Sequence, residues 1–515
     1  MEEEQDTYIT KLIKGTGLFL IFGFYSYVIA FFFKLFVARH YGPSDLGLLI
    51  LAQTILGLLV LIASLGVNNG ITRYIPYYKE RKETKALTGY IEFIFRIPII
   101  FSIILSILLF IFSKNLTNFF QFPMEFSIFL KIISLVLPIS ILNQTIRKIF
   151  LAESKPIYTV TSYHLLECTI LFFTALLFIY LDLPMVFIVA ALCLSILIPA
   201  IYNLLIYKIK ISLPLSKIKT FFIKDWFNFS WPLLFTGIFA FFISWSDNLI
   251  IGKFLEPTQL GIYSIAYSLA IFLIFFQKSF SHIFVPLISE NYAKKNLDNI
   301  TFLFRNAAAW TFGLTFPFFL VIILFSKQIL SLLFGSEFAP GFIALIIISI
   351  GVLINISTGL CMEVLMLYKK TKFIFSVNLF IALTNIVLNL ILIPILGILG
   401  AAITSAFSIA LQNLFFLWKA LRYQKLSFNW IYNVKFIIAG FPSVFIALFV
   451  FRSLIFNKLL AIIVTGVVYL IVYVVILLII KTPTKEDIRI LLMVEKKLGL
   501  NLIFIKRILS KIYKY

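Results

Sequence analysis

The chain has 515 residues, of which 62% are apolar and 13% charged, and its mean hydropathy is +1.06. A soluble protein carries about 25% charged residues, and this chain has too few polar side chains to cover a water-soluble surface. The composition excludes a soluble enzyme, a nucleic-acid-binding protein and a disordered chain, so the net charge of +22 is tested first as a topology signal.

Fourteen apolar stretches are long enough to cross a bilayer as helices, which takes about 20 residues each. They lack the two-residue alternation of barrel strands, so we predict an all-α polytopic membrane protein. In chain order, the predicted spans are 16–38, 46–69, 91–113, 127–149, 158–181, 184–207, 229–252, 260–285, 303–325, 340–364, 373–395, 397–418, 436–455 and 459–480. The connections between them are too short for a soluble catalytic domain.

The basic residues predict the orientation of these spans. With the N-terminus in the cytoplasm, 33 of the 44 Lys and Arg residues fall on the inner side and six on the outer side. Such an excess marks cytoplasmic loops, so we expect both termini inside. The tail 481–515 is predicted to be a basic amphipathic helix on anionic lipid.

The N-terminus and the cysteines predict no further structural feature. The N-terminus reads Met-Glu-Glu-Glu-Gln-Asp, without a basic region, so no removable signal peptide is expected. The three cysteines lie in apolar segments, which predicts neither a disulfide framework nor a zinc site. We expect no metal and no cofactor.

An internal repeat divides the chain. Phe112–Lys114 recurs as Phe325–Lys327, 213 residues later. Pro43, Leu46, Gly47 and Ala52 recur at nearly the same spacing, 214 residues, as Pro257, Leu260, Gly261 and Ala266. The repeat unit contains six spans, an even number, so both copies enter the membrane in the same direction, as in secondary transporters that work by alternating access.

The repeat predicts the domain organisation. We expect an N-terminal six-helix bundle over 1–220 and a parallel second bundle over 221–430. Two additional helices over 431–480 and the tail 481–515 follow.

Several stretches resemble the polysaccharide flippases of the Wzx type, which belong to the MOP superfamily together with lipid II flippases and MATE antiporters. The resemblance covers roughly 10–430 and is carried by Arg39–Gly47, Ser64–Tyr74, Asp247–Lys253, Leu333–Phe338 and Asn385–Ala402. It implies a V-shaped pair of six-helix bundles whose first, second, seventh and eighth helices line a cavity. It also implies export of undecaprenyl- or dolichyl-linked sugars, although fourteen helices depart from the twelve of MATE antiporters.

Charged and polar side chains in or beside the spans are the candidates for function, because a charge at mid-membrane costs about 2.5–3.5 kcal/mol on insertion scales. The implied cargo is a glycan on a lipid phosphate, and Lys and Arg supply the charge and donors that bind a phosphate. The candidate substrate-binding residues are Lys34, Asn68, Arg73, Asp247 and Lys278.

Each of these residues has a structural alternative. Lys34 could snorkel to the outer interface, and Arg73 could be a cytoplasmic anchor near Asn68. Lys278 lies in the inner half of the eighth span. Asp247 could bind a coupling ion or form an ion pair with a cation.

The fifth span holds two candidates for ion coupling. Glu167 and His164 are three residues apart on one helical face, which would allow a proton relay, because His titrates near neutral pH. A hydrogen bond between helices is the alternative. Other polar pairs are expected to be structural: Glu92 with Arg96, Asn385 with Asn389, and an interfacial Glu363 beside Lys369.

The favoured function is a flippase for lipid-linked oligosaccharide in the cell membrane, serving surface polysaccharide or glycoprotein synthesis. Its partners would be the lipid-linked glycan, membrane lipids and a glycan polymerase or glycosyltransferases, with no nucleic acid. The alternative is a MATE-like small-molecule or drug antiporter, which should carry fewer cavity cations and more membrane carboxylates. An enzyme is not expected, because the outer loops hold no paired carboxylates and no glycine-rich nucleotide loop occurs.

Overall fold

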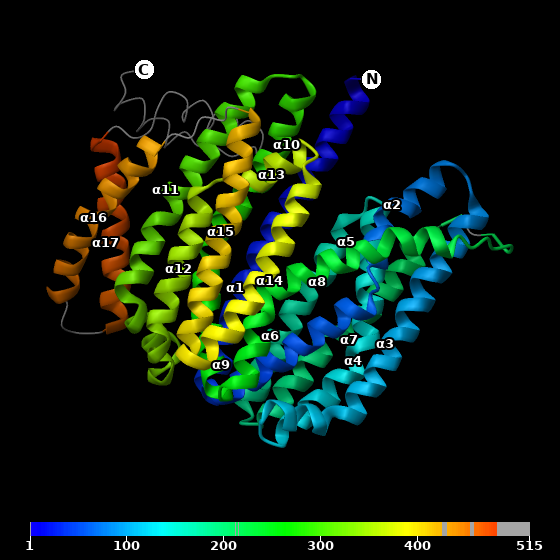
Figure 1. Ribbon diagram of the computed structural model, residues 1–515, viewed down its shortest axis with the longest axis horizontal. Coiled ribbons are helices and arrows are strands. Elements are labelled where there is room, and N and C mark those ends of the chain that lie inside the picture. Colours follow the sequence, from blue (N-terminus) through cyan, green and yellow to red (C-terminus); the bar gives the residue numbers. More distant parts are fainter. Residues whose placement is uncertain (1, 212, 215, 425–429, 454–457, 481–515) are drawn as a thin grey trace. The chain divides into compact units, whose positions relative to one another are not determined.

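The computed structural model describes residues 2–211, 213–214, 216–424, 430–453 and 458–480, and all regular secondary structure in these residues is helical (Figure 1). The prediction of an all-α fold is confirmed. The α-helices are α1 (Glu2–Ala63), α2 (Val67–Glu80), α3 (Thr84–Phe120), α4 (Glu125–Ala152), α5 (Pro156–Val160), α6 (Cys168–Tyr180), α7 (Met185–Lys210), α8 (Ile223–Phe254), α9 (Pro257–Phe272), α10 (Ile274–Ala293), α11 (Leu297–Ile329), α12 (Phe342–Ser357), α13 (Cys361–Leu367), α14 (Thr371–Leu396), α15 (Ile398–Gln424), α16 (Trp430–Ser453) and α17 (Lys458–Ile479). Short π-helical segments η1 (Thr161–Glu167) and η2 (Leu330–Phe334) and the 3₁₀ segment η3 (Ser336–Gly341) complete the list.

These helices carry the predicted spans. In the described part of the chain, 10 helices are long and apolar enough to cross a membrane, or up to 11 if the bent pair α9–α10 is one span. α1 carries the first predicted span and most of the second, and the chain leaves helical geometry between them at Gly42. The last two fall on α16 and α17, which hold shorter apolar stretches at Asn433–Ile446 and Val464–Ile479. The chain is therefore a multi-pass membrane protein, and the predicted tail helix lies outside the described residues.

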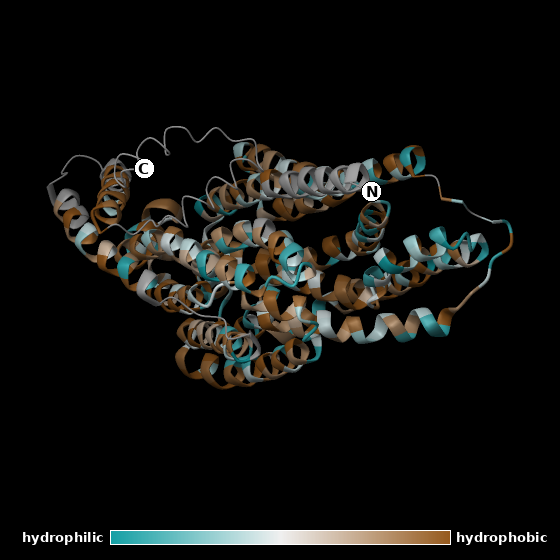
Figure 2. Ribbon diagram, turned by 90° about the horizontal axis from the view of Figure 1, so that it is seen from above, coloured by the Kyte–Doolittle hydropathy of each residue, from teal (hydrophilic) through white to brown (hydrophobic). Residues whose placement is uncertain are grey.

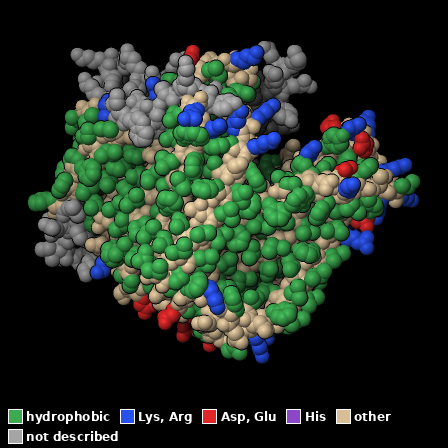
Figure 3. Space-filling view, viewed as in Figure 1, with side chains coloured by type: hydrophobic (Ala, Val, Ile, Leu, Met, Phe, Trp, Pro, Cys, Tyr) green, Lys and Arg blue, Asp and Glu red, His purple; other side chains and the backbone are tan. Residues whose placement is uncertain are grey.

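Side chains on the outer faces of the helices suit a lipid environment. Large apolar residues stay exposed along α3, among them Ile104, Ile107 and Ile111. Figure 2 shows apolar residues along most helices, and Figure 3 shows apolar side chains over most of the visible surface. In water such a surface would aggregate, so the exposed faces of these helices are read as lipid-facing.

Contacts between residues group the chain into two compact units. Unit 1 comprises the chain up to Ser268 with Leu333–Ala344 and Phe375–Ser408, and unit 2 comprises Leu269–Leu332, Leu345–Ile374 and the chain from Ile409 on. This grouping follows packing, whereas the predicted boundaries at residues 220, 430 and 480 follow the sequence repeat. Those boundaries stay a prediction.

Unit 1 packs around α1 and α4. α4 contacts α3, α7 and α2, and α1 contacts α4, α6 and α8. At one end of α8, Trp226 is fully buried among residues of α2 and α3, and its indole Nε1 donates to the Tyr78 hydroxyl at 2.8 Å. Unit 2 packs α11 against α10, α16 and α17, with Phe284 and Leu303 in its core.

The two copies of the repeated motif touch each other inside unit 1. Pro43 follows the break at Gly42, and Pro257 is the first residue of α9, so each copy begins a helical segment with proline. A Cβ on Gly47 would lie 1.9 Å from the Pro257 carbonyl oxygen, and a Cβ on Gly261 would lie 1.9 Å from that of Pro43. Such a reciprocal contact is what a two-fold relation between the copies produces.

Candidate functional site

Lys34 is a half-buried cation near the middle of α1. Its ammonium donates to the Ser268 hydroxyl of α9 at 2.5 Å, and Ser268 donates to the carbonyl of Ser264 at 2.7 Å. No carboxylate lies within 4 Å of the ammonium in the described part of the chain. A hydroxyl partner leaves the charge uncompensated, so Lys34 can attract an anion.

Arg73 is exposed on α2 and stacks on aromatic rings. Its guanidinium carbon lies 4.3 Å from the centre of the Phe229 ring of α8 and 5.5 Å from that of Tyr74. Among described residues, no carboxylate is within salt-bridge distance. The rings orient the guanidinium while its five N–H donors remain available to a phosphate.

Asn68 has a packing role in the structure. Its side chain is buried, its amide donates to Gln144 of α4 at 3.2 Å, and its carbonyl oxygen accepts from Thr145 at 3.3 Å. These contacts tie α2 to α4. They do not favour the predicted role of Asn68 in substrate binding.

Asp247 lies in a network of neutral hydrogen-bond donors. It is 2% exposed and accepts hydrogen bonds from the Tyr263 and Ser405 hydroxyls and from the Asn389 amide, the last at 2.6 Å. None of the described Lys or Arg residues lies within 4 Å of its carboxylate, so the predicted ion pair with a cation is not formed there. The Asp247 carboxylate is therefore buried, and no described Lys or Arg residue balances its charge.

Further polar side chains extend this network. Asn389 also donates to Asn385 at 3.1 Å, and Ser246 donates to Asn385 at 2.6 Å. The two asparagines are fully buried on α14, as expected for polar residues that join helices in a membrane. The Asn389 side-chain oxygen is buried and accepts no hydrogen bond in the described structure. It is an open acceptor on the amide that binds Asp247.

Glu167 forms an ion pair with Arg147 of α4, and Arg147 also donates to the Ser162 hydroxyl at 3.0 Å. Ser162 and Glu167 are five residues apart, which in an α-helix, at 3.6 residues per turn, would place them about 140° apart. Both lie in the π-helical segment η1, whose wider turn brings residues five apart to one face. The π-helix therefore lets both groups bind one guanidinium.

His164 has a different partner. Its ring Nδ1 lies 2.9 Å from the hydroxyl of Ser26 on α1. The ion pair of Glu167 and this contact support the structural alternative for the two residues over a proton relay. The relay stays a prediction.

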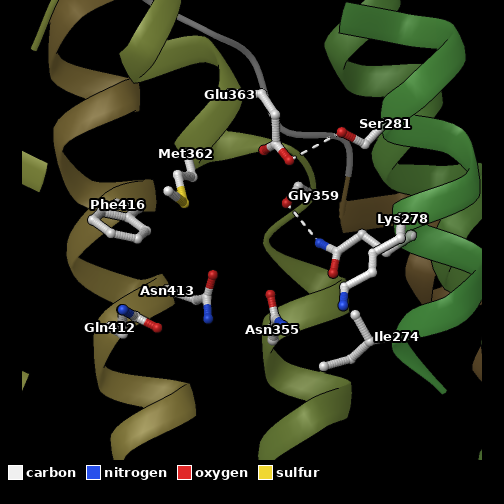
Figure 4. Close-up of a pocket in the computed structure, with 11 residues that line it drawn as sticks. Ile274, Lys278, Ser281, Asn355, Gly359, Met362, Glu363, Gln412, Asn413 and Phe416 are labelled. Carbon is white, nitrogen blue, oxygen red and sulfur yellow. Dashed lines mark hydrogen bonds between the residues drawn. The ribbon is translucent and has the colours of Figure 1, made fainter. Parts of the chain in front are cut away.

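Lys278 lines a cavity of about 440 Å³ inside unit 2 (Figure 4). Three segments form its walls: α10, the junction of α12 and α13, and α15. The Glu363 carboxylate, expected at the interface, lines this cavity too and accepts from Ser281 at 3.1 Å. The amides of Asn355 and Gln412 also line it.

A break in the helical chain shapes this cavity. Between α12 and α13, Gly359 has a left-handed φ of +71°, and a Cβ there would lie 2.7 Å from the Ala308 side chain. Its carbonyl, released from helical bonding, accepts from the Gln277 amide at 2.9 Å. Broken helices of this kind are tolerated in membranes where they line a cavity.

The structure does not gather the predicted residues into one site. Lys34, Asn68, Arg73 and Asp247 belong to unit 1, and no hydrogen bond or ion pair joins any two of them in its described residues, whereas Lys278 belongs to unit 2. Sequence reasoning missed Arg147, which lies at the end of the predicted span 127–149, and the cavity amides. A scan for amides on one face of an apolar stretch would have found Asn355 and Gln412.

The chain is similar to glycan flippases and to related transporters. Residues 36–342 match a family model described as polysaccharide biosynthesis protein. The chain is 28% identical to the probable low-salt glycan biosynthesis flippase Agl15 of Haloferax volcanii over 207 residues, 40% of this chain and 43% of that protein.

Two solved structures have the same fold. The lipid II flippase MurJ in its inward closed conformation matches with a TM-score of 0.72 and 17% identity, covering 90% of this chain and 98% of that one. An inward-facing multidrug resistance MATE transporter of the MOP superfamily matches with a TM-score of 0.61 and 16% identity, covering 78% and 94%. At these identities the likeness shows the fold alone.

Proposed function

Since the chain belongs to the polysaccharide biosynthesis protein family, we propose that it is a flippase that moves a lipid-linked oligosaccharide across the membrane by alternating access. The cargo would be a glycan on a polyprenyl phosphate or pyrophosphate. Family membership is the observation that carries the proposal, because the fold is shared by lipid II flippases and drug transporters.

Two cations of unit 1 supply the chemistry that this cargo needs. Lys34 and Arg73 have no carboxylate within 4 Å among the described residues, so each can receive a phosphate oxygen. A charge-assisted hydrogen bond to a phosphate contributes about 1.5–3 kcal/mol. This lowers the barrier that hydrocarbon presents to an anionic headgroup. Lys278 remains a candidate for the glycan, whereas the hydrogen bonds of Asn68 to α4 support a packing role for that residue.

We propose that Asp247 binds the coupling ion. It is a buried carboxylate with neutral donors only, and the Asn389 side-chain oxygen beside it lacks a donor. A cation bound here would provide a positive partner for the Asp247 carboxylate and for the Asn389 side-chain oxygen. If Asp247 couples transport, Asp247→Asn should abolish acceleration by an ion gradient while retaining slow exchange, and an unchanged response to proton and sodium gradients would refute the assignment.

Transport rather than catalysis, residence in the cell membrane and cytoplasmic termini are parts of the same proposal. They are supported by the named activities of the relatives and by the distribution of basic residues. Glycosyltransferases or a glycan polymerase would act on the same lipid-linked glycan before or after it is moved.

The test is flipping by the full chain in liposomes that contain a polyprenyl-pyrophosphate-linked sugar, followed by lectin access to the outer leaflet. Lys34→Gln and Arg73→Gln should each slow flipping about tenfold, since each removes one charge-assisted hydrogen bond. The matched control is Arg81→Gln, an exposed arginine just after α2 that pairs with Glu83 and should leave the rate unchanged.

Two results would contradict the proposal. Normal flipping by both variants would refute the roles of the cations. A wild-type protein that exchanges cationic drugs for ions but does not flip the lipid-linked sugar would establish the antiporter alternative, for which the buried carboxylate of Asp247 is the favourable observation.

A further inference from the structure

The cavity of unit 2 is rich in amides, and the phosphate chemistry proposed above makes no use of them. Beside the Ser281 hydroxyl, its polar lining consists of Gln277, Asn355, Gln412, Asn413, Lys278 and Glu363. An amide offers both donors and acceptors, so a matching ligand must accept and donate at several points. Hydroxyl groups do both. Polar groups in an apolar helical protein are costly, so a cluster of six indicates a ligand.

Two of these groups have hydrogen-bonding capacity that the described structure leaves unused. The Asn355 side chain is half-buried and makes no hydrogen bond to another described residue. The Glu363 carboxylate accepts from the Ser281 hydroxyl, and no described basic group lies within 4 Å. A carboxylate has about four acceptor sites, so most of its capacity is available to a ligand.

The Glu363 carboxylate disfavours a phosphate, although Lys278 lines the same cavity. A phosphate or pyrophosphate in this cavity would face the Glu363 carboxylate, which repels it, whereas a neutral hydroxyl can donate to it. One carboxylate alone is also a poor site for a divalent cation, which takes six or more oxygen ligands. An apolar chain would leave the Asn355 amide unsatisfied.

The size and the apolar part of the lining suit a sugar ring. A volume of about 440 Å³ is within the range of small-molecule sites, roughly 300–1,000 Å³. Ile274, Met362 and Phe416 supply apolar surface beside the amides (Figure 4). Sugars present both hydroxyls and C–H faces.

We propose that this cavity is a sugar subsite that binds an uncharged, hydroxyl-rich ring of the lipid-linked glycan. Glu363 and Asn355 hydrogen-bond its hydroxyls, and Lys278 donates to a ring or hydroxyl oxygen. The assignment rests on the proposed function, because it names the part of the same substrate that the phosphate-binding cations do not contact. With the termini in the cytoplasm, Lys278 lies in the inner half of its span, so the subsite would receive the glycan from the inner side.

The experiment measures binding of simple sugars to the full chain in detergent micelles by saturation-transfer NMR. The probes are the methyl glycosides of glucose, galactose, mannose and N-acetylglucosamine, and inorganic pyrophosphate is the competitor. At least one glycoside should bind, and excess pyrophosphate should not displace it. Glu363→Gln and Asn355→Leu should each weaken glycoside binding about tenfold. The first loses a charge-assisted hydrogen bond, and the second loses the hydrogen bonds of the amide.

The matched control is Glu125→Gln, which removes one carboxylate from the exposed start of α4 in unit 1 and should leave sugar binding unchanged. Met362→Trp, at a partly exposed wall of the cavity, fills it without removing a polar group and should also block binding. This second variant decides the matter if Glu363→Gln does not fold, as judged by gel filtration.

The outcomes separate the subsite from the proposed function. Absence of glycoside binding to a wild-type protein that flips lipid-linked sugar would overturn the subsite alone. Displacement by pyrophosphate would make the cavity a phosphate site and overturn it too. Glycoside binding that depends on Glu363 and Asn355, in a protein that does not flip the lipid, would support the sugar subsite and refute the proposed flippase function.

Discussion

Replacing Gly261 by alanine tests the contact between the two motif copies. The new Cβ would lie 1.9 Å from the Pro43 carbonyl oxygen, whereas contacts of Cβ atoms below 3.0 Å essentially do not occur. The backbones must therefore separate by about 1.1 Å, the difference between these two distances. Rotation of a side chain cannot relieve the clash, because the opposing atom belongs to the backbone.

The expected loss of stability is the balance of two effects. Overpacking of a rigid contact costs about 1–3 kcal/mol or more, and a clash with backbone is at the upper end. Alanine is better than glycine in a helix by about 1 kcal/mol. The net loss is then about 2 kcal/mol, which lowers the Tm by a few degrees in a chain of this size.

Thermal unfolding in detergent, followed by light scattering or by intrinsic fluorescence, measures this shift. Gly23→Ala is the matched control, because no atom lies within 4 Å of the position of its Cβ. It should leave the Tm unchanged or raise it slightly. Equal Tm values for Gly261→Ala and Gly23→Ala would refute the reasoning, and Gly47→Ala should repeat the loss on the other side of the contact.

Other substitutions test the polar contacts of unit 1. Arg147→Met leaves the Glu167 carboxylate without its cation and should cost up to about 3 kcal/mol of stability. Adding Glu167→Leu removes the unpaired carboxylate and should recover part of this loss. No recovery in the double variant would show that the two residues are not coupled. Trp226→Phe removes the hydrogen bond to the Tyr78 hydroxyl and should lower the unfolding free energy by about 1–3 kcal/mol, so an unchanged Tm would contradict the burial of this bond.

The spans could be predicted because hydrophobic length is a local property. Each predicted stretch lies on one helix or on a broken helix, and α1, which leaves helical backbone angles at Gly42, carries the first stretch and most of the second. The repeat could be found because its motif begins helices with proline. The pairs Glu92–Arg96 and Asn385–Asn389 follow from helical spacing, and both are present.

The contacts between distant helices could not be predicted. Arg147 has the position of a cytoplasmic anchor in the sequence, and only the packing of α4 against α5, which leads into η1, brings it to Glu167. Glu363 lies near Lys369 in the sequence, but the break at Gly359 turns it toward α10. In both cases a local departure from α-helical geometry changes which face a residue occupies.

The π-helical segment Thr161–Glu167 has a consequence for insertions and deletions. A π turn amounts to one residue more than an α-helix of the same span needs. Deleting one residue between Ser162 and Glu167 would restore α-helical bonding and leave these two residues four apart, about 40° around an α-helix. Arg147 could then still bind both of them. This segment should therefore tolerate a one-residue deletion, whereas in a regular α-helix the same deletion would rotate one side of the helix against the other by about 100°.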